Sequence, residues 1–71
     1  MIEKKYSVPA ISCKHCVHTI QMELAEMETV HTVHADESSK VVTVTMNDES
    51  AESGVLNMLS EIGYPATKEI Q

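Results

Sequence analysis

The sequence contains no arginine, no phenylalanine and no tryptophan, and these absences limit both its fold and its function. Without the large apolar aromatic residues, the core has to be built from valine, isoleucine, leucine, methionine and alanine. Five lysines stand against eleven acidic residues, which gives a formal net charge of -6. Proteins that bind nucleic acid or an anionic membrane surface neutralise phosphates with lysine and arginine, so this charge argues against both kinds of partner.

Long apolar runs are missing as well. No stretch approaches the roughly 20 residues that cross a bilayer, and no charged leader followed by an apolar segment opens the chain. These features predict a cytoplasmic protein without membrane insertion. The length predicts a single domain over residues 1–71 with a small core, because small domains bury a smaller share of their surface.

Cysteine is scarce: the chain has only Cys13 and Cys16, separated by Lys14 and His15. Two cysteines three positions apart fit a reducing compartment better than a scaffold held by disulfides. The pair lies between a strand-like and a helix-like stretch, which places Cys13 in a loop and Cys16 in the first helical turn. Backbone N–H groups and the positive end of the helix dipole favour thiolates there. The motif therefore predicts a soft-metal site or a redox site.

Periodicity of apolar residues predicts six elements. These are strands at 2–8, 29–35, 40–46 and 65–70, and helices at 14–27 and 51–62. The first helix is expected to bury a stripe consisting of Val17, Ile20, Leu24 and Met27. The short polar turn at 36–39 predicts an antiparallel hairpin, and Gly63 suits a helix C-cap. This order is the ferredoxin-like βαββαβ sandwich, an α+β fold with a four-stranded antiparallel sheet and two helices on one face.

The placement of Cys-x-x-Cys within this order makes the pattern specific. A strand, the cysteine pair at the opening of the first helix, and the remaining elements ending in Ile62-Gly63-Tyr64 resemble the heavy-metal-associated domain family. The similarity covers about residues 4–70. This family comprises small copper chaperones and the metal-binding domains of heavy-metal P-type ATPases.

The resemblance assigns roles by position. It implies that Cys13 and Cys16 are the two thiolate ligands of the metal, that His15 lies between them without being a ligand, and that Tyr64 approaches the metal loop. Copper members of the family usually carry an inward-pointing methionine two residues before the first cysteine. This chain has Ile11 there, which can replace the burial of that methionine.

The expected function is that of a non-enzymatic copper chaperone, with no catalytic residues. Monovalent copper is soft and tolerates low coordination, so Cys13 and Cys16 suffice to hold it, whereas structural zinc takes four ligands. An open coordination shell admits a thiolate from a copper-transporting P-type ATPase or another acceptor, and Lys14 can offset the negative charge of the complex. A copper-bridged homodimer would join four cysteines from two chains.

Several alternatives stay open at this point. Zinc, cadmium, mercury and silver are other soft-site metals, and a domain of a larger ATPase would have the same features, although the start at Met1 favours a free chaperone. Tyr64 serves either as a core anchor or as a shield of the site. The remaining histidines, methionines and acids are expected to be ordinary helix, core and surface residues, among them His15, His18, Met22, Met27, Met46 and Met58.

Two other functions compete with a carrier. Cys13, Cys16, His31 and His34 have spacings close to a zinc finger, but histidines three apart in a strand point to opposite faces. A thiol-disulfide oxidoreductase would also use Cys-x-x-Cys. Against it, the chain lacks the additional elements of a thioredoxin fold, and Pro65, the candidate cis-proline, follows a tyrosine and is expected to be trans.

Overall fold

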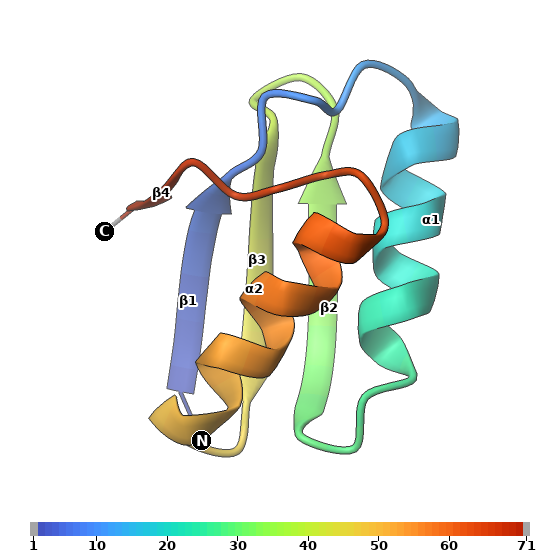
Figure 1. Cartoon of the computed structure of the whole chain (residues 1–71). Helices are drawn as coiled ribbons and strands as arrows, with labels where there is room; N and C mark the ends of the chain where they lie inside the picture. The colour runs from blue at the N-terminus through green and yellow to red at the C-terminus, as the bar shows by residue number, and fades with distance from the viewer. Residues whose placement is uncertain (1, 71) are drawn as a thin grey trace.

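The computed structural model describes residues 2–70 and places two α-helices on one face of a four-stranded antiparallel sheet (Figure 1). The elements are β1 (Ile2–Ser7), α1 (Lys14–Ala25), β2 (Val30–Asp36), β3 (Val41–Met46), a 3-10 turn (Glu49–Ala51), α2 (Glu52–Glu61) and β4 (Lys68–Ile70). The strand order is β2-β3-β1-β4. Element order and topology confirm the predicted ferredoxin-like fold. Within residues 2–70, neither helix is long and apolar enough to cross a membrane.

The core lies between the sheet and the helices. The strands β1, β2 and β3 contribute inward-facing residues, and along β3 these alternate with less buried ones as the pleat requires. The residues of this core that are almost completely buried are Tyr6, Val8, Ile11, Ile20, Leu24, Val42, Val44, Met46, Val55 and Leu59. The hydroxyl of the buried Tyr6 donates a hydrogen bond to Glu52 Oε2 at 2.7 Å, which ties α2 to the central strand β1.

The buried stripe of α1 is rotated from its predicted position. Cys16, Ile20 and Leu24 are buried, while Val17 and Met27 are only partly covered. The helix begins at Lys14 with Cys13 as its N-cap, so the core-facing line starts at Cys16 and repeats every four residues. The predicted end at Met27 was also wrong, because the chain tightens into a turn after Ala25.

All four strands differ from the predicted bounds by one to three residues, and two of these differences have a clear physical reason. Lys40, placed by pattern in the third strand, has a positive φ of 60° and belongs to the preceding turn. The last strand starts at Lys68 instead of 65, because Pro65 has no N–H for a ladder and the first bond to β1 runs from Thr67 N to Ser7 O.

A bulge at the start of β2 decides where the histidines of this strand lie. Val30 pairs with Met46 but Thr32 pairs with Thr45, so His31 is an extra residue in the ladder. The bulge lets Val30 face the core together with Ala35 despite their odd spacing, and both are buried. His31 is exposed, and its Nε2 is hydrogen-bonded to Asn47 Oδ1.

Candidate metal centre

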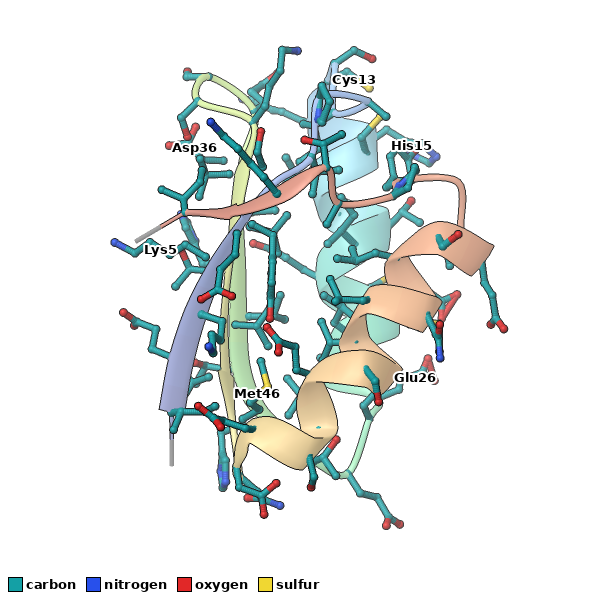
Figure 2. The ribbon with its side chains drawn as sticks, turned by 60° about the vertical axis from the view of Figure 1, so that its left-hand side comes forward. Lys5, Cys13, His15, Glu26, Asp36 and Met46 are labelled. Atoms are coloured by element: carbon teal, nitrogen blue, oxygen red, sulfur yellow. The ribbon has the colours of Figure 1, made fainter. Side chains whose placement is uncertain are left out.

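The loop between β1 and α1 carries the cysteines at one end of the molecule, where Figure 2 also shows His15. Val8 and Ile11 anchor this loop, since both are fully buried and Ile11 N donates to Val8 O at 3.1 Å. Pro9 between them suits the second position of such a turn. The burial of Ile11 confirms that isoleucine fills the inward-pointing position.

Cys13 and Cys16 converge as the sequence predicted. Cys13 is the exposed N-cap of α1, and Cys16 lies in the first turn with 8% of its surface exposed. Both are free thiols, and their Sγ atoms are 3.6 Å apart. Cys16 N and Val17 N both donate to the Cys13 carbonyl, so the start of the helix fixes the two sulfurs relative to each other.

The pKa of Cys16 is lowered from its ordinary value to about 6, which favours the thiolate at neutral pH. A hydrogen bond from the side chain of Tyr64 is the largest cause, followed by one from the backbone N–H of Ser12. The Cys13 and Ser12 side chains lower it further, while burial acts in the opposite direction. A buried sulfur that receives several donors is a nucleophile and a metal ligand without requiring alkaline pH.

Tyr64 reaches Cys16 because of the way α2 ends. Gly63 takes a positive φ of 90°, which glycine adopts without a Cβ penalty. Tyr64 N donates to Leu59 O at 2.8 Å and Gly63 N to Ser60 O at 3.2 Å, the two bonds of a Schellman cap. This cap directs Tyr64 toward the cysteine loop, and the bond to Cys16 raises the pKa of the tyrosine itself.

We expect Tyr64→Phe to raise the pKa of Cys16 clearly, because the substitution removes its strongest donor. The ultraviolet absorbance of the thiolate, followed during a pH titration, measures the shift. Ser12→Ala should shift the curve less, since the serine hydroxyl is the smallest of the named causes. A titration curve that Tyr64→Phe leaves in place would contradict this assignment.

The same ionisation gives stability a pH dependence. The folded pKa lies below the ordinary thiol value of 9.0, so ionisation of Cys16 favours the folded state increasingly between pH 6 and 9. This contribution is fully present above the ordinary value and is lost as the pH falls through about 6.

The spacing of the sulfurs bears on how they can share a metal. With metal–sulfur bonds of about 2.3 Å, sulfurs 3.6 Å apart subtend an angle of about 100° at the metal. A linear two-coordinate ion would need them about 4.6 Å apart, a trigonal three-coordinate ion about 4.0 Å and a tetrahedral four-coordinate ion about 3.8 Å. The metal-free loop is therefore closer to the geometry in which further ligands complete the coordination than to a linear one.

The other candidate ligands do not join the cysteines. Within residues 2–70, no group of three or more His, Cys, Asp or Glu side chains is arranged to hold a metal ion. His31 and His34 are exposed on β2, so the four-ligand arrangement of a zinc finger is not assembled. His15 and His18 are exposed on α1, as expected.

Two residues near the cysteines had no role in the sequence analysis. Ser12 donates to Cys16 through its backbone and its side chain, and Lys40 Nζ donates to the carbonyl of Ile11. The position of Ser12 directly before the helix N-cap was a local signal that could have found it. Lys40 is 29 positions from its partner, and no sequence spacing pointed to this contact.

Comparisons with known proteins agree on the architecture. The heavy-metal-associated domain model matches residues 5–65. Oxidized MerP from Ralstonia metallidurans CH34 superposes with a TM-score of 0.88 at 22% identity, covering 99% of this chain and 97% of MerP. The CopZ metallochaperone gives 0.86 at 21% identity, covering 93% and 100%.

A third structure is more similar in sequence. The heavy metal binding protein TM0320 from Thermotoga maritima is 30% identical, with a TM-score of 0.82 and coverage of 99% of this chain and 98% of its own. A search of curated protein sequences found no significant match.

Proposed function

Because this chain belongs to the heavy-metal-associated domain family, we propose that it carries monovalent copper on Cys13 and Cys16 and passes it to an acceptor protein. The family gives the chain a metal-binding role. The observation that carries the proposal is the convergence of two free sulfurs, 3.6 Å apart, at the start of α1, with Cys13 exposed. Both sulfurs belong to one short segment, so they can chelate a single ion.

The donor set favours a soft monovalent ion. Thiolates select soft metals, and copper in this state is stable with two or three ligands, whereas zinc completes a tetrahedron. The described residues bring together two sulfurs without a third or fourth side-chain ligand of the usual kinds. A complex of two thiolates and one monovalent ion carries a net negative charge. Lys14, exposed beside Cys13, stabilises this charge by electrostatic attraction.

Hand-over follows from the asymmetry of the pair. Cys16 is buried on the core-facing side of α1, while Cys13 is exposed, so an incoming thiolate approaches from the side of Cys13. The sulfur spacing is about 1.0 Å shorter than a linear ion would need, which leaves room for an acceptor sulfur to join before either Cys13 or Cys16 leaves. The acceptor is a copper-transporting P-type ATPase or another protein with a thiolate pair. A second copy of this chain would give a copper-bridged homodimer.

The same site supports an alternative. A metal-binding domain of a heavy-metal P-type ATPase, or a carrier of zinc or mercury, would present the same two thiolates. CopZ is described as a metallochaperone and TM0320 as a heavy metal binding protein, which supports the general role for this chain without choosing the metal.

Ligand exchange predicts that transfer depends on the acceptor. Copper-loaded, unlabelled protein is mixed anaerobically with an excess of metal-free, isotope-labelled protein, and copper arrival is followed at the amides of the labelled Cys13 and Cys16. We expect the transfer rate to rise linearly with the concentration of the labelled chain, because its thiolate enters before the donor's leaves. A labelled Cys13→Ser, Cys16→Ser acceptor is the control and should take up none. A rate that is independent of acceptor and equal to release into a chelator would contradict the exchange mechanism.

A further inference from the structure

Lys40 has an unusual backbone for its residue type. It closes the turn between β2 and β3, where its N–H donates to Asp36 O at 2.9 Å, and its φ is 60°. Among residues 2–70 it is the only non-glycine residue with a positive φ. Glycine, asparagine and aspartate are the usual residues in this conformation, because glycine has no Cβ to clash and the other two can hydrogen-bond the local backbone. An outlier of this kind suggests that the lysine side chain has a function of its own.

The contacts of Lys40 all lead to the base of the cysteine loop. Its carbonyl accepts from Val8 N at 2.8 Å, and its Nζ donates to the carbonyl of Ile11. Ile11 N in turn donates to Val8 O at 3.1 Å, so three hydrogen bonds form a closed ring through these three residues. Val8 and Ile11 are fully buried, and the ring therefore rests on the core.

The peptide group that follows Ile11 connects this ring to a sulfur. The carbonyl of Ile11 and the N–H of Ser12 belong to the same planar trans peptide unit, so they point in opposite directions. The carbonyl accepts from Lys40 Nζ, and the N–H belongs to Ser12, whose Oγ lies 3.9 Å from Cys16 Sγ. The ammonium group thus holds the peptide unit that places Ser12 next to Cys16, directly before Cys13.

We propose that Lys40 is a positioning residue for the metal loop: by bonding the Ile11 carbonyl, it fixes the peptide unit that places Ser12 beside Cys16 and that precedes Cys13. The proposal rests on the proposed function for its effect on copper, but its effect on the loop exists without metal. It makes the β2–β3 turn, distant in sequence from the cysteines, part of the metal site.

Lys40→Gly separates the effect of the Lys40 side chain from that of its backbone conformation. Glycine adopts a positive φ freely, so the turn is kept while the ammonium group is removed. We expect copper affinity to fall about tenfold, the low end of what supporting contacts around a metal site contribute. In the metal-free protein, amide hydrogen exchange at Ser12 and Cys13 should accelerate about tenfold, while the thermal midpoint stays the same or rises.

Two further variants make the test specific. Lys40→Arg retains a long cationic donor and should recover most of the copper affinity and the slow exchange. Lys68→Gln also removes one positive charge, from an exposed position on β4, and should behave as the wild type.

The outcomes are distinguishable. If Lys40→Gly stayed within twofold of the wild type in both copper affinity and the exchange rate of the Ser12 amide, the proposal would be overturned. Lys40 would then be an ordinary turn residue. Exchange that accelerates equally across the whole sheet would also overturn it, because the lysine would then only stabilise the fold. A wild-type protein that fails to bind copper would refute the proposed function, while the exchange at Ser12 still decides the role of Lys40.

Discussion

Replacing Cys13 and Cys16 together by serine is expected to abolish tight binding of monovalent copper and leave the fold intact. Serine offers a hard, protonated oxygen that soft copper does not favour. Because the described residues bring no other side-chain ligands to the pair, each single serine variant should also lose more than the roughly 10- to 100-fold that supporting contacts contribute.

Anaerobic titration against a copper chelator measures this effect, and far-ultraviolet circular dichroism checks the fold. His15→Ala is the matched control, since this residue lies between the cysteines and is exposed. It should bind copper like the wild type. Tight, stoichiometric binding by the double serine variant would place the copper elsewhere and contradict the site.

Ile20→Ala is expected to lower the free energy of unfolding by about 2–5 kcal/mol. Ile20 is completely buried on α1, one turn beyond Cys16, and truncation leaves a cavity between the helix and the sheet. A chain of 71 residues has a total stability of only about 4–10 kcal/mol, so the variant should be close to unfolding. Urea denaturation followed by circular dichroism gives the difference.

Met22→Ala is the control on the same helix. Met22 is 54% exposed, so its truncation should change stability by no more than about 0.5 kcal/mol. If Ile20→Ala cost less than about 1 kcal/mol, the packing of α1 on the sheet described here would be wrong.

The fold could be predicted because its elements have clear periods. Val42, Val44 and Met46 alternate with threonines and valine along β3, and this alternation fixed which face is buried. Element ends were less predictable. Lys40 lies outside β3 because of a backbone conformation that no sequence pattern encodes. On α1, the buried stripe contains Cys16 in place of the predicted Val17.

The site was predictable only where it is local. Cys13 and Cys16 are neighbours on one helix start, so their convergence follows from helical geometry. The contact of Tyr64 with Cys16 came from the family resemblance, and its physical cause, the Schellman cap at Gly63, requires the structure. The bond from Lys40 to the loop depends on how the hairpin packs beside β1, which no local spacing records.

The pair of thiolates is expected to hold monovalent copper in preference to zinc. The most direct test is an anaerobic titration of the reduced wild-type protein with monovalent copper in competition with a strong copper chelator, repeated with zinc. We expect one tight copper equivalent per chain and much weaker zinc binding. The opposite result would be zinc binding that organises the fold and is lost when His31 and His34 are replaced. It would contradict both the copper site and the proposed hand-over mechanism.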